Sequence, residues 1–265
     1  GRVKMKRIAA VLLLVVSGAT QAESLLPFGK SWAGDRDLPK PYGIGVDLLT
    51  LKQDYAIKSL AFELPGATVG DPNTIGVSNS INHVDLKADA WVFPFLNVFG
   101  VLGKVHARTP VNLSSVSVPN APPGLFNELV IRYSGEVYGA GFTLAYGGDH
   151  WFTSLTGTYA ETSLSGDFDS NVTSKSWQPR FGLTQGPWAF WVGSLIVDVQ
   201  EDHAGSIALP FVGNVPFAVE LENKDNAGMV FGANCSLADT VDIALEVGKG
   251  ARTSTLLNLT WRFGE

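Results

Sequence analysis

Apolar and polar residues alternate along much of this chain, in segments of about ten residues. From His83 to Phe93, four consecutive odd positions are ionisable, whereas the even positions beside them are apolar. Because successive side chains of a strand point to opposite faces, this segment is predicted to be a strand with one polar and one apolar face. The segments with related patterns are Tyr42–Gln53, His83–Phe93, Asn97–Arg108, Leu129–Tyr146, Trp151–Thr162, Lys175–Thr184, Trp188–Glu201, Asn226–Leu237, Val241–Gly248 and Thr253–Phe263.

The connections between these segments alternate between short and long. The short ones are tight turns at Pro94–Leu96, Gly147–His150, Gln185–Pro187 and Ala238–Thr240. The others are mostly long, polar and rich in Gly, Pro, Asn and Ser, except for the short Lys249–Arg252: they are Asp54–Asn82, Thr109–Asn127, Ser163–Ser174 and Asp202–Asp225. Strands that cross a membrane must close into a ring, since every backbone group in lipid needs a hydrogen-bond partner. Short turns on one side and long loops on the other are typical of such barrels.

These features predict an all-β fold. Residues 42–265 are expected to form a transmembrane antiparallel up-and-down β-barrel of about ten strands, with short periplasmic turns and long extracellular loops. With an even strand number, both ends of the barrel segment lie on the periplasmic side. Twelve strands are the alternative, since Ile207–Phe211 and Val215–Leu221 could form a further hairpin. Pro210 and Pro216 favour a hairpin that stands above the membrane.

The first 22 residues have the pattern of an export signal. Lys4–Arg7 is a basic start, Ile8–Val16 is an unbroken apolar run, and small residues follow up to position 22, after which cleavage is expected. This apolar run is too short for a membrane-spanning helix, which needs roughly twenty residues. Residues 1–4 are expected to be upstream read-through, and residues 23–41 a periplasmic segment.

The charge balance excludes nucleic acid as a partner. The chain has 19 Lys and Arg and 25 Asp and Glu. The expected signal holds four of the basic residues and none of the acidic ones, which leaves 15 basic against 25 acidic residues. Cys235 is the single cysteine, and the sequence has neither a Cys/His cluster with metal-ligand spacing nor a phosphate-binding Gly-rich loop after a suitable strand. No cofactor is expected.

Aromatic residues gather near the short-turn ends of the predicted strands. Rings with an apolar body and a polar atom concentrate where a bilayer meets water. We therefore expect a periplasmic aromatic girdle that consists of Trp91, Phe93, Trp151, Trp188, Trp191, Trp261 and Phe263.

The last predicted strand, Leu257–Phe263, resembles the C-terminal strand of bacterial outer-membrane β-barrel proteins in its alternating apolar residues and its aromatic close. In that superfamily the barrel-assembly machinery recognises this strand, and the resemblance implies this role for Leu259, Trp261 and Phe263. Two residues follow the Phe, whereas the family usually ends on it. The resemblance implies a place in the outer membrane of a Gram-negative bacterium, in contact with lipid and lipopolysaccharide, and indicates no particular subfamily.

Polar faces that point inward would give the lumen nearly balanced charges. On Asn97–Arg108, the odd positions from Phe99 to Ala107 are expected to face lipid and Lys104 the lumen. Opposite charges in a narrow barrel pair and plug it, whereas a ring of one sign indicates an ion-selective pore. Asp47 shares the expected inward face with the members of the lumen charge network, which are Asp85, Lys87, Asp89, Lys104, Arg132, Glu136, Arg180, Asp198, Asp242, Glu246 and Arg262.

Three functions are compatible with these sequence features. The first is a non-catalytic structural, adhesive or surface-interaction role of the extracellular loops, toward an extracellular ligand that the sequence does not identify. The second is a narrow porin-like channel for small solutes, since about ten strands lie near the closed end of the range of barrel sizes. The third is an outer-membrane hydrolase, which is supported by Asp202 and His203, with Ser206 close by, at the expected outer rim and by His83 and Asp85 at the outer end of their strand. We predict that the protein is not an enzyme.

Overall fold

The computed structural model describes residues 26–63, 66, 68–71, 75–112, 114, 116–117, 128–166, 168–209, 213–223 and 226–264. The expected export signal, residues 1–22, lies outside this part of the chain. Within the described residues, no helix has the length and hydrophobicity needed to cross a membrane.

These residues form a short 3-10 helix and a series of β-strands. The elements are η1 (Lys30–Ala33), β1 (Tyr42–Phe62), β2 (Thr68–Val69), β3 (Val77–Phe93), β4 (Leu96–Asn112), β5 (Val116–Ser117), β6 (Glu128–Gly147), β7 (Trp151–Gly166), β8 (Phe168–Gln185), β9 (Trp188–Leu209), β10 (Gly213–Asn223), β11 (Ala227–Leu237), β12 (Val241–Gly250) and β13 (Arg252–Phe263). β2 and β5 pair separately from the main sheet.

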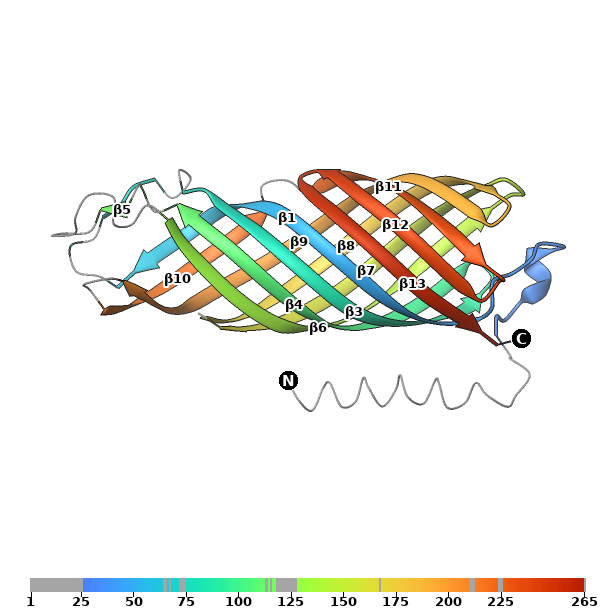
Figure 1. Ribbon diagram of the computed structural model, residues 1–265, viewed down its shortest axis with the longest axis horizontal. Coiled ribbons are helices and arrows are strands. Elements are labelled where there is room, and N and C mark those ends of the chain that lie inside the picture. The colour runs from blue at the N-terminus through green and yellow to red at the C-terminus, as the bar shows by residue number, and fades with distance from the viewer. Residues whose placement is uncertain are drawn as a thin grey trace.

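The main sheet closes into a barrel. It has 11 strands in the order β10-β1-β13-β12-β11-β9-β8-β7-β6-β4-β3, and the further pairings β1–β3 and β9–β10 join it to itself. The strands tilt strongly around the barrel (Figure 1). All of them except β10 reach the barrel end that carries Tyr42 and Phe263. The predicted antiparallel barrel of ten strands is confirmed, and the twelve-strand alternative is wrong because β10 stops short of this end.

We call the end with Tyr42 and Phe263 the turn end, and the opposite end the loop end. The β3–β4, β6–β7, β8–β9 and β11–β12 connections all lie at the turn end, so the four predicted tight turns are confirmed. In the β11–β12 turn, Ala238 and Asp239 have φ angles of 51° and 57°. Two successive left-handed residues give a hairpin turn whose twist matches that of the flanking strands.

The barrel wall changes its strand number along its length. β1 pairs with β13 up to Gln53 and with β10 from Tyr55 onward. β9 pairs with β11 as far as Ile196 and with β10 from Gln200. β10 therefore replaces β11, β12 and β13 at the loop end, and the ring narrows from ten strands to eight (Figure 1). We call the place where the end of β10 meets the β12–β13 turn the seam.

The polarity of the inner and outer faces of the barrel wall is reversed between its two halves. On β3 the odd positions face the interior throughout, and both Asp89 near the turn end and Val77 near the loop end are buried. The even positions face outward, where Leu86 and Ser78 are exposed. The alternation is unbroken, but the turn-end half is polar inside and apolar outside, and the loop-end half is the reverse.

Apolar side chains fill the interior of the loop-end half. Inside this core, Thr109 Oγ1 donates a hydrogen bond of 3.0 Å to Asn79 Oδ1, and Asn79 Nδ2 donates one of 2.7 Å to the Tyr133 hydroxyl. A filled interior is what an eight-strand ring accommodates. The buried apolar residues form two clusters: Val105, Ala107, Ile131, Tyr133, Val137, Leu164 and Phe217, and Tyr55, Ile57, Ile75, Val77 and Leu221.

Residues 26–41 lie against the turn end. The Phe28 backbone N–H donates a hydrogen bond of 2.8 Å to the Val92 carbonyl oxygen. The Trp32 ring stacks on Phe93 and Phe95, with ring centroids 5.8 and 6.2 Å apart. These contacts hold η1 beside the β3–β4 turn.

Candidate functional site

A polar cavity of about 260 Å³ lies inside the turn-end half of the barrel. Carboxylates and cations from several strands face this common space. The residues that line it are Asp47, Lys87, Asp89, Arg180, Trp191, Asn234, Asp242, Ala244, Glu246, Leu256, Asn258, Thr260 and Arg262.

Glu246 on β12 accepts hydrogen bonds from three side chains of β8 and β9. Its carboxylate is buried and accepts from Gln178 Nε2 at 2.8 Å and from Trp191 Nε1 at 2.7 Å. Arg180 donates through Nε at 3.1 Å and through Nη2 at 2.8 Å. Hydrogen bonds between charged groups are shorter and stronger than neutral ones, so this cluster ties β8 to β12 across the interior.

Arg262 on β13 joins two carboxylates. Its Nε donates to Asp242 at 3.0 Å and its Nη1 to Asp89 at 3.2 Å. Asn97 Nδ2 donates a further hydrogen bond of 2.6 Å to Asp89. The guanidinium therefore connects β12 with β3 and places its charge between two acids.

Lys87 on β3 has a different environment. Its Nζ lies 4.2 Å from the centroid of the Phe99 ring, within the range of a cation–π contact. Phe99 therefore faces the interior and not lipid, contrary to the sequence-based expectation. Among the described residues, the buried Oδ1 atom of Asp85 accepts no hydrogen bond, although His83 Nδ1 lies 3.8 Å away.

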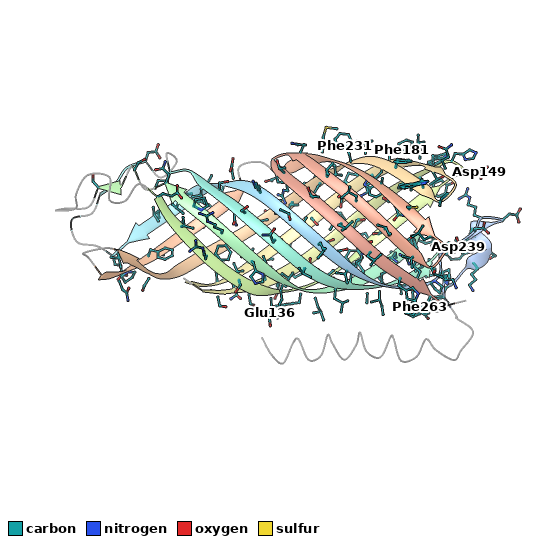
Figure 2. All side chains as sticks on the ribbon, in the orientation of Figure 1. Glu136, Asp149, Phe181, Phe231, Asp239 and Phe263 are labelled. Carbon is teal, nitrogen blue, oxygen red and sulfur yellow. The ribbon has the colours of Figure 1, made fainter. Side chains whose placement is uncertain are left out.

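The structure separates the predicted lumen network into two groups. Lys104, Arg132, Glu136 and Asp198 are exposed on the outer surface, as Figure 2 shows for Glu136. Lys104 lies opposite Glu136 on β6, and both are exposed on the outer face, so the predicted place of Lys104 in the lumen is wrong. All four lie toward the loop end, where the outer face is polar. The residues on inward faces of the turn-end half are Asp85, Lys87, Asp89, Arg180, Asp242, Glu246 and Arg262.

The expected aromatic girdle is also divided. Trp151, Trp188 and Trp261 are exposed near the turn end, where Phe263 stacks on Trp261 with ring centroids 4.9 Å apart. Phe93 stacks on Phe95 beside the β3–β4 turn.

Two of the expected girdle tryptophans face inward instead. Trp191 donates to Glu246, and Trp91 lies on the same face of β3 as Asp89, with its Nε1 buried. Their place in the girdle is therefore wrong, because proximity to a strand end does not fix the face on which a side chain lies.

An apolar belt covers the outer face of the turn-end half. Phe181 and Phe231, whose side chains stand outside the ribbon in Figure 2, are both exposed. A continuous apolar surface of this kind marks contact with lipid, and the closed sheet satisfies the backbone groups there. The turn-end half is therefore a membrane-spanning β-barrel. The belt includes Val46, Leu48, Val84, Leu86, Val98, Leu144, Phe181, Leu183, Phe231, Ile243, Leu245, Leu257 and Leu259.

Several neutral residues of the site were not predicted from the sequence. Gln178, Trp191 and Asn97 donate to the buried carboxylates, and Asn258 donates to Asp47. A usable signal exists for two of them, since Gln178 stands two positions from Arg180 on β8 and Asn258 stands four positions from Arg262 on β13. The side chains of Asp202 and His203 lie outside the described residues.

No family model matches this sequence, and no curated protein matches it. The fold is similar to the β domain of the Bordetella autotransporter BrkA, with 11% identity over 84% of this chain and 100% of that one, and a TM-score of 0.43. It is similar to the transport unit of the Escherichia coli autotransporter AIDA-I (10% identity, 93% and 97% covered, TM-score 0.42). An outer membrane channel from Pseudomonas putida F1 is similar at 12% identity (87% and 98% covered, TM-score 0.39). Similarity at this level says nothing about the function of this chain.

Proposed function

We propose that the protein is a narrow channel for small solutes, without a catalytic step, and that this conformation is its closed state. The observation that supports the proposal is the cavity of about 260 Å³, in which carboxylates and cations share one interior space within the membrane-embedded half. A barrel that serves only as an anchor gains little from charges in its interior, because each one must be desolvated and paired.

Two features hold the proposed pathway closed. In the turn-end half, ion pairs join Arg180 on β8 to Glu246 on β12 and Arg262 on β13 to Asp89 on β3, and all four side chains line the cavity. In the loop-end half, Tyr133 and Phe217 are part of the apolar core that fills the ring. Opening therefore requires this core to rearrange, whereas the charges of the cavity set the ion preference. We place the loop end outside the cell, as the distribution of short turns suggests.

Planar-bilayer recordings of the refolded protein test this function. The wild type is expected to open rarely and with low conductance. Arg262→Ala removes the cation between Asp89 and Asp242, so both carboxylates lose a partner. This variant is expected to open more often and to prefer cations. Lys104→Ala is the matched control, because it removes a cation from the outer surface and should change neither property.

Two results would refute the channel. One is the absence of current from both the wild type and Arg262→Ala, in samples whose circular dichroism and heat-modifiable electrophoretic mobility show folded barrels. The other is an equal change of ion preference in Lys104→Ala and Arg262→Ala, since charge inside the cavity would then have no special effect.

A surface-interaction role is the second candidate. The polar outer face of the loop-end half supports it, for example the exposed ion pair between Lys58 Nζ and Glu220 Oε1 at 3.0 Å. We infer that this half projects beyond the lipid, beside lipopolysaccharide. We also propose that the barrel-assembly machinery recognises Leu259, Trp261 and Phe263 on β13.

A further inference from the structure

Two polar side chains meet inside the barrel at the level of the seam. Gln53 and Arg252 form the last pair between β1 and β13, and the next pair on β1, at Tyr55, is with β10. Both side chains lie on the inward faces of their strands, directly across from each other. They are buried, with exposed fractions of 3% for Gln53 and 6% for Arg252.

These side chains present three buried donor atoms without acceptors. Among the described residues, no group accepts a hydrogen bond from Arg252 Nε, Arg252 Nη2 or Gln53 Nε2. An arginine stays protonated even when buried, so the positive charge remains in this place. Leaving two nitrogens of a buried guanidinium without acceptors is costly, and such a cost is tolerated where the group has a function.

The two arginine nitrogens form one edge of the guanidinium. Nε–H and one N–H of Nη2 point in parallel, which matches the two oxygens of a carboxylate bidentately. The amide of Gln53 supplies a further donor from the neighbouring strand. The set of donors therefore fits a planar anion with two oxygens better than a single point charge.

The surroundings specify the rest of the ligand. On the loop-end side, Tyr55 and Leu221 belong to the buried apolar cluster that fills the ring. Val230 on β11, 1% exposed, lies on an inward face at the level of the seam. On the turn-end side, the next inward residues of β1 are Leu51 and Leu49, before the cavity is reached at Asp47. Apart from Asn79, which lies opposite Gln53 on β3 and is hydrogen-bonded to Thr109 and Tyr133, the donors are flanked mainly by apolar side chains in both directions.

We propose that Arg252 and Gln53 bind the carboxylate of an organic anion whose remaining part is apolar. The three nitrogens are covered by protein atoms, so binding displaces side chains at the seam, where the ends of β10 and β11 meet the β12–β13 turn. The binding site is independent of transport. That the bound anion is also the solute that passes through the barrel rests on the proposed function.

Binding is measured with the full-length protein refolded in uncharged detergent. Hexanoate and benzoate are compared with their neutral counterparts, 1-hexanol and benzyl alcohol, and with inorganic phosphate. The carboxylates are expected to raise the unfolding temperature, because a ligand that binds only the folded state stabilises it. The alcohols and phosphate are expected to leave it unchanged.

Substitutions connect this effect to the site. Arg252→Lys keeps the charge and loses the paired N–H groups, so calorimetry should show carboxylate affinity roughly 10- to 100-fold weaker. Arg252→Met should abolish the stabilisation by carboxylates, yet leave unchanged or raise the unfolding temperature of the ligand-free protein. Gln53→Leu should weaken the affinity severalfold. Lys249→Met is the matched control, since it removes the same charge from the outward face of β12 near the seam.

Each outcome decides the proposal. Equal stabilisation by alcohols and carboxylates, or stabilisation by phosphate alone, would refute the carboxylate site. A lower unfolding temperature of ligand-free Arg252→Met would assign the side chain a structural role instead. Loss of binding in Lys249→Met as large as in Arg252→Met would also refute it. If carboxylates bind but the protein does not conduct, the binding site is supported and the channel is refuted. If the protein conducts but carboxylates do not bind, the channel is supported and the binding site is refuted.

Discussion

Replacing Glu246 by Gln tests whether ion pairs hold the interior of the barrel together. The substitution keeps the size of the side chain and one oxygen acceptor, which suffices for Gln178 or Trp191 but not for both, and it removes the charge that faces Arg180. The Arg180 side chain is only 22% exposed, so its charge stays in a partly desolvated place. Removing one partner of a buried pair costs about 3–5 kcal/mol of unfolding free energy. Because Arg180 is still partly exposed, we expect a loss of about 3 kcal/mol, at the lower end of this range.

The free energy of unfolding is measured by urea titration of the refolded protein in phospholipid vesicles, followed by tryptophan emission. Glu220→Gln is the matched control, because it makes the same chemical change in an exposed pair, in which Lys58 and Glu220 are 56% and 42% exposed. Pairs in water contribute about 0–1 kcal/mol, so the two variants should differ by about 2 kcal/mol or more.

Equal losses in the two variants would contradict this reasoning. They would mean that the cavity screens charge as well as bulk water does. The pairing of Arg180 with Glu246 could then not contribute to closure of the pathway, although the packed loop-end core would remain.

Two further predictions concern the faces and the orientation of the barrel. Leu86→Arg puts a charge into the apolar belt and should destabilise the protein by about 2–4 kcal/mol if the site is near the bilayer midplane. Ser78→Arg, on the same face of β3, should cost much less. Similar losses of stability in the two variants would contradict the reversal of polarity between the two halves of the barrel. An epitope tag inserted at Asp71 should be stained on intact cells, and staining only after permeabilisation would reverse the proposed orientation.

Strand number and turn positions could be predicted because both depend on local sequence. Two-residue alternation marks a strand wherever one face differs from the other, and short polar gaps mark hairpins. The direction of each face is harder to predict. On β4, the even positions change from Val98 and Leu102 to Lys104 and His106, so one outward face is apolar and then basic. A rule that gives each strand a single polar face therefore places Lys104 inside, which is wrong.

The partners in the site could not be predicted in the same way. Arg180 and Glu246 are 66 residues apart and lie on strands that are not neighbours in the sheet, so their contact depends on closure of the ring. Trp191 illustrates a second limit. An aromatic residue near a strand end suits the membrane interface and the lumen equally well. The register between strands decides, since Trp191 on β9 and Glu246 on β12 both pair with Gly232 on β11 and therefore share a face.

The seam has a consequence for how the chain folds. The ring at the turn end closes through β1 and β13, the first and last strands of the barrel. The ring at the loop end closes through β1 and β10, so a chain that extends only to Asn223 already contains every strand of that ring. Contacts between segments closer in sequence form sooner, since less loop entropy is lost. The narrow end can therefore close first and serve as the template on which β11, β12 and β13 complete the wider ring.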